Sequence, residues 1–226
     1  MGVAIRMKLN EKLYLKDPQE TKLGRKIIQH GILLLDELGL ESFNFKKLAV
    51  RIGSTEASVY RYFENKHLLL TYLVCWYWEW ISYQIEIGTM NIKDPAEKLR
   101  IVIRIMVAAS QENPDIQFIN ESVLHRLVIR EGVKAYHTKD VDEENKSGFF
   151  LNYKAMTGKI AEFIHELNPD FPYPRALASN IFEMANNQIY FSEHLPRLTD
   201  ITFQEDYLQK VEELLEYVVF KLVRPD

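Results

Sequence analysis

The chain has 226 residues, of which 47% are hydrophobic and 27% are charged, and its formal net charge at pH 7 is −4. This composition excludes a disordered or fibrous chain, and the length is enough for one large domain or two small ones. The acidic balance argues against a protein that is basic over its whole surface. Cys75 is the only cysteine, which excludes an intrachain disulfide and a zinc site made of several thiolates.

The hydrophobic pattern is helical almost throughout and predicts an all-α fold. The first helix is expected at about residues 21–38, where apolar side chains recur at every third or fourth position. Gly39 is expected to end it. Two short helices follow, and each is preceded by a side chain that can cap it, namely 45–52 after Asn44 and 56–63 after Thr55.

The rest of the chain is predicted to form longer helices. Proline-containing segments separate several of them, and the polar stretch 137–148 is expected to be a loop. The expected helices lie at about 66–87 (with Asn65 as its cap), 95–112, 116–131, 149–167, 175–194 and 204–223.

Charge is spread unevenly along the chain. Residues 1–67 contain 12 Lys and Arg against 8 Asp and Glu, a balance of +4, whereas residues 68–226 contain 16 against 24, a balance of −8. A mildly basic head on an acidic body is the charge pattern that a local DNA-binding module would have, but charge alone does not establish one. The alternative is a surface whose composition is merely uneven.

The segment 44–66, NFKKLAVRIGSTEASVYRYFENK, predicts a helix-turn-helix. Ala49 is small enough to let the second helix cross closely, and Gly53 can adopt the left-handed backbone that the turn needs. Val59 is expected to point inward and hold the pair together. The polar side chains of the second helix then point outward, where its first half can enter a DNA major groove about 12 Å wide.

This segment resembles the helix-turn-helix of the TetR (tetracycline-repressor) family of transcription regulators, and the resemblance extends over residues 21–70. The preceding helix also fits the family pattern, with Ile27, Ile28 and Leu35. The residues that carry the resemblance are Gly39, Phe43, Asn44, Leu48, Ala49, Gly53, Ser54, Thr55, Ala57, Ser58, Val59, Tyr60, Tyr62, Phe63 and Lys66.

The resemblance implies a homodimeric DNA-binding regulator, usually a repressor, which a small molecule releases from a palindromic operator on double-stranded DNA. It implies an N-terminal arm (1–20), a DNA-binding domain (21–67) and a ligand-binding and dimerisation body (68–226). Positions that touch phosphates in the family correspond to Thr55, Ser58, Tyr60, Tyr62 and Lys66. Positions near base edges correspond to Glu56, Ala57 and Arg61. Positions where the first helix of the pair approaches the DNA backbone correspond to Asn44, Lys46 and Lys47.

Three residues depart from the family pattern. Gly31 replaces a usual alanine, and we expect close packing there. Ser54 replaces an aliphatic residue in the turn, and Glu56 stands where lysine is common. We hypothesise that Glu56 accepts a hydrogen bond from a cytosine N4 amino group. The alternative is that Glu56 only complements the positive end of the helix.

Aromatic residues are concentrated in the fourth predicted helix. Trp76, Trp80 and Tyr83 share one face, and such a stripe is usually part of a hydrophobic core. The resemblance places this helix beside the ligand cavity, so these residues are candidate pocket walls together with Phe118. They favour an apolar or aromatic effector.

The last two predicted helices are candidates for the dimer seam. Their apolar stripes are wide, and two such helices from each subunit would form a four-helix interface around a two-fold axis. The alternative for each residue is a place in the internal core. The candidate interface residues are Phe182, Ile189, Tyr190, Val211, Leu215 and Val218.

The competing hypothesis from another class is a helical-bundle metalloenzyme. Glu162 and His165 have the spacing of a di-iron motif, and Glu121 shares a helix face with His125, but a complete site needs a second Glu-x-x-His. No nucleotide-binding, zinc-protease or nucleophile motif is present, so we expect no enzyme, metal or cofactor. A third possibility is a small-molecule- or partner-binding helical protein that no longer reads DNA.

We also expect a cytoplasmic protein with no membrane partner. The first residues lack the apolar core of a secretory signal. The most apolar run, residues 68–78, has 11 residues, which is short of the ~18 that a bilayer span needs.

Overall fold

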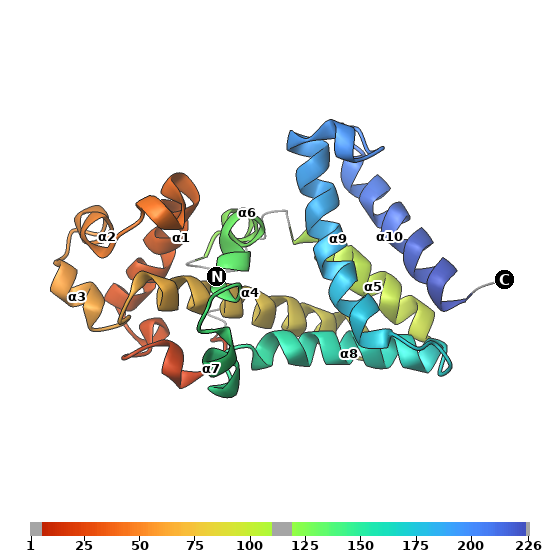
Figure 1. Cartoon of the computed structure of the whole chain (residues 1–226), viewed down its shortest axis with the longest axis horizontal. Helices are drawn as coiled ribbons and strands as arrows, with labels where there is room; N and C mark the ends of the chain where they lie inside the picture. Colours follow the sequence, from red (N-terminus) through yellow and green to blue (C-terminus); the bar gives the residue numbers. More distant parts are fainter. Residues whose placement is uncertain (1–5, 110–118, 225–226) are drawn as a thin grey trace. The chain divides into compact units, whose positions relative to one another are not determined.

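The computed structural model describes residues 6–109 and 119–224. These ranges contain ten α-helices, α1 to α10, and no strand (Figure 1), which confirms the predicted all-α fold. No helix in the described ranges combines the length and apolarity that crossing a bilayer requires.

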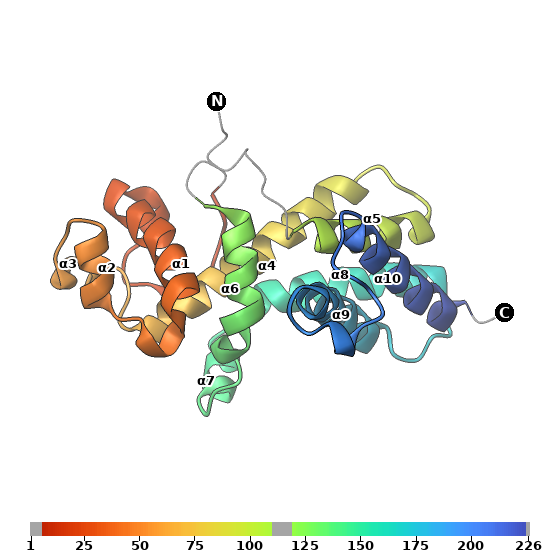
Figure 2. The ribbon, with the colours of Figure 1, turned by 90° about the horizontal axis from the view of Figure 1, so that it is seen from above.

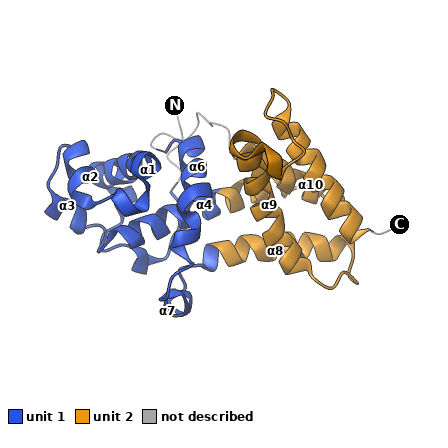
Figure 3. Cartoon of the chain, turned by 45° about the horizontal axis from the view of Figure 1, so that its top comes forward, with its two compact units in different colours: residues 1–80, 110–152 blue, residues 81–109, 153–226 orange. Residues whose placement is uncertain are grey.

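The chain divides into two compact units (Figure 3). Unit 1 consists of residues 1–80 and 110–152, and unit 2 of residues 81–109 and 153–226. The helices α4 (Lys66–Thr89) and α8 (Leu151–Leu167) contribute to both. These two units are defined by packing. The boundary expected after residue 67, between a DNA-binding domain and a ligand-binding body, is a division by function and stays a prediction.

Unit 1 holds the predicted helix-turn-helix. Its helices besides the first part of α4 are α1 (Lys22–Ser42), α2 (Phe45–Arg51), α3 (Glu56–Tyr60), α6 (Glu121–Glu131) and α7 (Val141–Lys146). α1 packs along α6 and α2 packs on α3, and α6 lies beside α1 in both Figures 1 and 2. The second half of the chain thus contributes a helix to the unit that contains the DNA-binding candidates.

Gly39 breaks α1, as the sequence predicts. Its φ of +70° lies outside the helical region, and a last turn follows as far as Ser42. Thr21 caps the other end by accepting a hydrogen bond from the Gly24 amide at 2.9 Å. The side chain of Thr21 therefore fixes where α1 begins.

Unit 2 packs α5 (Pro95–Ala108), α9 (Pro174–His194) and α10 (Tyr207–Val223) against one another. One stripe of α10 is fully buried, because apolar residues recur every four positions on its inner side. The Asn168 side chain, which follows α8, donates to the Val223 carbonyl at 2.8 Å and closes the end of α10.

Several predicted boundaries differ from the structure. The polar stretch 137–148 contains the short helix α7, which has three acidic residues in its first turn, where they complement the helix dipole. None of its residues is buried, so it has no apolar stripe to reveal it. The third helix ends at Tyr60 instead of residue 63, and the last begins at Tyr207 instead of residue 204. The predicted helix start at 116 lies outside the described residues.

The predicted N-terminal arm is folded onto unit 1 from Arg6 onward. Two 3-10 turns, Glu11–Leu13 and Pro18–Glu20, interrupt it, and the Leu13 side chain is fully buried. The Asn10 side chain donates to the Ser147 carbonyl at 2.8 Å. This segment is therefore part of the packed unit.

Candidate nucleic-acid interface

The turn between α2 and α3 has the geometry that the sequence predicts. Gly53 has a φ of +64°, and the Ser54 amide donates to the Ala49 carbonyl at 2.9 Å. No atom lies within 4 Å of the position that a Cβ on Gly53 would take, so the backbone conformation alone requires glycine there. Val59 is fully buried, which confirms that it points inward and holds α3 on α2.

Both predicted N-caps of the motif are confirmed. The Asn44 side chain accepts from the Lys47 amide at 2.9 Å, and the Thr55 hydroxyl accepts from the Ser58 amide at 3.2 Å. Arg61 donates to the Ser58 hydroxyl at 3.1 Å, so a side chain on α3 orients the guanidinium that follows the helix. The cap at Thr55 fixes the start of α3, and the bond from Arg61 to Ser58 orients the cation just beyond its end.

Most of the predicted DNA-binding residues lie on the surface of the helix-turn-helix. Ser58 and Lys66 are half-buried, and Tyr62 is buried. Tyr60 is 47% exposed, although its ring packs edge-on against Phe45 with centroids 5.0 Å apart. The exposed set comprises Asn44, Lys46, Lys47, Thr55, Glu56, Ala57, Tyr60 and Arg61.

Tyr62 is placed mainly for packing. It is 4% exposed, and its hydroxyl forms a hydrogen bond of 2.7 Å with the Thr21 hydroxyl at the start of α1. The Lys16 ammonium lies 5.6 Å from its ring centroid. Tyr62 therefore ties the end of the recognition helix to α1 and to the N-terminal segment, and its phosphate contact stays a prediction.

Lys66 makes contacts that sequence reasoning did not foresee. Its ammonium donates to the carbonyls of Leu40, Glu41 and Phe43 at 2.7, 3.2 and 3.4 Å. These carbonyls belong to the last turn of α1 and the link to α2, where a cation is favourable. Lys66, the first residue of α4, thus holds the segment that leads from α1 into the helix-turn-helix. Its expected phosphate contact is untested.

A second clamp on the same turn comes from α6. Glu131 accepts a hydrogen bond from the Leu40 amide at 3.3 Å, just beyond the Gly39 kink. Asp36 forms ion pairs of 3.1 and 3.4 Å with Arg126 and Arg130. The α6 residues and their partners in α1 are 90 or more positions apart in the sequence, so no local sequence pattern could reveal these contacts.

The candidate ligand residues fall into different environments. Trp76 and Trp80 are buried in unit 1 with their rings stacked at a centroid distance of 6.2 Å. Tyr83 belongs to unit 2 and is exposed, and Phe118 lies outside the described residues. The aromatic stripe is therefore core for at least Trp76 and Trp80, and a role in lining a pocket stays a prediction.

A buried polar pair that the ligand prediction did not include joins α4 to α6. The Tyr77 hydroxyl and His125 Nδ1 are 2.7 Å apart, and both side chains are buried. Burial, with a smaller effect of Arg126, lowers the pKa of His125 to about 4, so the ring is neutral at pH 7. Burial also raises the pKa of Tyr77, which stays protonated.

Four of the six candidate dimer residues are buried within the single chain. Phe182, Ile189, Val211 and Leu215 belong to the interior, as the alternative interpretation expected for some of them. Tyr190 and Val218 are half-exposed. Tyr217 and Leu222 of α10 are also exposed and add apolar surface next to Val218. The sequence pattern did not single them out, because the buried stripe dominates the apolar periodicity of this helix.

The carboxylate–histidine motif of the alternative metalloenzyme lies on the surface. Glu162 and His165 are both exposed on α8. Within the described ranges, no three side chains of His, Cys, Asp or Glu come together as a metal site would require. The geometry therefore gives the metalloenzyme hypothesis no support.

Taken together, the helix-turn-helix and the helical remainder give the chain a TetR-like fold. A solved structure of AibR with isovaleryl coenzyme A and operator DNA has a TM-score of 0.60 and 15% identity, covering 89% of this chain and 100% of that one. A TetR-family regulatory protein from Rhodococcus RHA1 has a TM-score of 0.63 and 14% identity, covering 88% and 97%.

The same fold also occurs in a protein described differently. The superantigen PfiT has a TM-score of 0.59 and 13% identity, covering 89% of this chain and 96% of that one. No protein-family model and no curated protein matches the sequence. Function must therefore be argued from the site and not from the fold alone.

Proposed function

We propose that this chain is a dimeric, sequence-specific DNA-binding transcription regulator, most simply a repressor, whose DNA affinity a small molecule changes. The observation that carries the proposal is the helix-turn-helix itself. Its recognition helix is capped at Thr55, is held on α2 by the buried Val59 and exposes Glu56 and Ala57, and Arg61 is exposed directly after its last residue. Such a helix can enter the major groove and reach base edges.

The proposed mechanism depends on the spacing of two recognition helices. In a two-fold dimer they must reach successive major grooves about 34–36 Å apart, or a multiple of that distance. The exposed side chains of α10, with Tyr190 of α9, are the surface we assign to the dimer contact. A ligand that favours a different spacing would shift the population away from DNA, by no more than its differential affinity for the two states.

The route for this coupling runs through α6 in unit 1. Its C-terminal half is clamped to α1 through Asp36 and Glu131, and its N-terminal half is bonded to α4 through His125 and Tyr77. A displacement of α6 would therefore move the turn from which the helix-turn-helix begins. The aromatic residues of α4 would favour an apolar or aromatic effector where they line a pocket, but Trp76 and Trp80 are packed in the core. Because AibR was crystallised with isovaleryl coenzyme A, acyl thioesters are the first class to test.

Selection of bound duplexes from a random DNA pool, at about 100 mM salt to keep phosphate contacts strong, tests this proposal. We expect enrichment of a palindrome with the half-site spacing given above, and loss of enrichment in Arg61→Ala. Arg61 is the better variant because Tyr62 and Lys66 make packing contacts whose loss would disturb the fold. Folded protein that enriches no sequence at this or lower salt would refute the regulator function.

The same selection tests the role of Glu56. If Glu56 reads a cytosine, Glu56→Ala changes the preferred base at one position of each half-site. An unchanged motif would leave Glu56 with a role in complementing the helix dipole only.

A further inference from the structure

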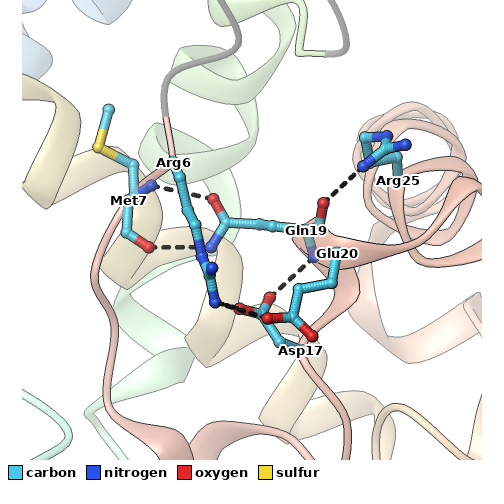
Figure 4. A network of polar contacts seen from close by, with 6 residues as sticks. All are labelled: Arg6, Met7, Asp17, Gln19, Glu20 and Arg25. Carbon is cyan, nitrogen blue, oxygen red and sulfur yellow. Dashed lines mark hydrogen bonds and ion pairs between the residues drawn. The ribbon is translucent and has the colours of Figure 1, made fainter.

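The N-terminal segment of residues 6–20 is held against the end of the recognition helix. The Leu15 amide donates to the Tyr62 carbonyl at 2.8 Å, two residues beyond the end of α3. The Met7 backbone exchanges hydrogen bonds of 3.0 and 2.9 Å with the Gln19 side chain (Figure 4). The segment is therefore fixed in place and does not need to be ordered when DNA binds.

Lys16 is the cation that this segment presents beside the recognition helix. It is exposed, and no carboxylate in the described residues lies within ion-pair distance of its ammonium, which sits 5.6 Å from the Tyr62 ring centroid. Both neighbouring acids are paired with Arg6, Asp17 at 2.7 Å and Glu20 at 2.9 Å (Figure 4), and neither forms an ion pair with Lys16 in the described structure. The positive charge of Lys16 is thus available to an external anion.

We propose that Lys16 contacts a DNA phosphate and that the N-terminal segment extends the DNA interface beyond the helix-turn-helix. This inference rests on the proposed DNA binding. Tyr62, at the position expected to touch a phosphate, is buried, and its hydroxyl is already bonded to Thr21. Lys16 stands exposed beside that position, so it supplies the charge that complements the DNA backbone at this edge.

The chemistry gives two expectations. Each phosphate contact releases counterions and contributes about 0.9 to the slope of log affinity against log salt on B-DNA. A dimer carries two copies of Lys16, so its loss lowers the magnitude of the slope by about 1.8. Phosphate contacts carry no sequence information, and the selected motif should therefore stay the same.

The experiment uses the full chain and a duplex carrying the palindrome selected by the wild type. Dissociation constants are measured by fluorescence anisotropy between about 50 and 300 mM salt for Lys16→Gln, which keeps most of the side-chain stem. Lys139→Gln is the matched control, because Lys139 is exposed in the connection before α7 and changes the net charge equally. Urea unfolding of both variants confirms that the fold is intact.

We expect a lower slope and weaker binding for Lys16→Gln, an unchanged slope for Lys139→Gln, and recovery in Lys16→Arg. An equal slope in Lys16→Gln and the wild type would overturn the inference while leaving the proposed function standing. An equal fall of the slope in Lys16→Gln and Lys139→Gln would also overturn it, because that result would show a general charge effect. A change in the motif that Lys16→Gln selects would overturn it as well. If the wild type enriches no duplex, the proposed function itself fails, and the inference falls with it.

Discussion

Replacing Lys66 by methionine tests whether this lysine holds the entrance of the helix-turn-helix together. Methionine keeps the length of the stem and removes the ammonium, which donates to three backbone carbonyls between Leu40 and Phe43. If the structural role is real, the protein loses stability even when no DNA is present.

The expected size follows from the three distances. Only the bond to the Leu40 carbonyl, at 2.7 Å, has the length of a strong charge-assisted hydrogen bond, while those of 3.2 and 3.4 Å are weak. A hydrogen bond to a charged group contributes about 1.5–3 kcal/mol net. We therefore expect Lys66→Met to lower the free energy of unfolding by about 1.5–3 kcal/mol.

Urea unfolding of the full chain, followed by far-ultraviolet circular dichroism, measures this loss. Lys46→Met is the matched control, because Lys46 is exposed on α2 and no hydrogen bond or ion pair involves its ammonium in the described structure. Its unfolding midpoint should match that of the wild type. If Lys66→Met also unfolds at the wild-type midpoint, the carbonyl contacts contribute nothing, and the assignment of Lys66 as a clamp is wrong.

Three further predictions concern stability. Gly31→Ala should raise the free energy of unfolding by up to about 1 kcal/mol, because alanine has the higher helix propensity and the new Cβ would meet the Leu69 side chain at an ordinary 3.5 Å instead of the close packing expected there; a lower urea midpoint would contradict this. Gly53→Ala should lower the free energy of unfolding by about 1–2 kcal/mol, because its φ of +64° is costly for any side chain, and an unchanged midpoint would contradict this. For His125, whose folded pKa of about 4 lies below its ordinary 6.5, stability is complete above pH 6.5 and declines as the pH falls towards 4, because the unfolded chain is protonated first. Between pH 7 and pH 5 the wild type should lose about 2 kcal/mol more than His125→Gln, and equal losses in a urea titration would refute the buried neutral imidazole.

The sequence was sufficient for those parts of the site that depend on neighbours in the chain. Asn44, Thr55 and Gly53 act within three or four residues of their own positions, so cap and turn chemistry predicts them directly. The inward position of Val59 follows from helical periodicity in the same way.

Contacts between distant segments could not be predicted from local patterns. Tyr62 reaches Thr21 across 41 positions, and Glu131 reaches Leu40 across 91. The sequence around Lys66 does not reveal the carbonyls that its ammonium binds, because they lie more than 20 positions earlier in the chain. These residues resemble surface residues in sequence because their partners come from other helices.

The apolar stripes of α9 and α10 show another limit. Periodicity identifies the widest apolar face of a helix, and that face is buried inside the subunit, as Val211 and Leu215 show. A symmetric contact between subunits needs residues that the single chain leaves exposed, such as Tyr217 and Leu222. Hydrophobicity alone does not distinguish the residues buried inside the subunit from those available for a contact between subunits.

The most direct test of the central claim, that α3 reads DNA sequence, is the ratio of affinities for the selected palindrome and for a scrambled duplex of equal length and composition. Measured by fluorescence anisotropy at about 100–150 mM salt, the wild type should favour the palindrome by roughly 1,000-fold or more. In Arg61→Ala the ratio should fall by about 30-fold or more, because a base contact is worth about 1–3 kcal/mol at each of the two half-sites. Equal wild-type affinity for the two duplexes would contradict sequence-specific regulation by this helix.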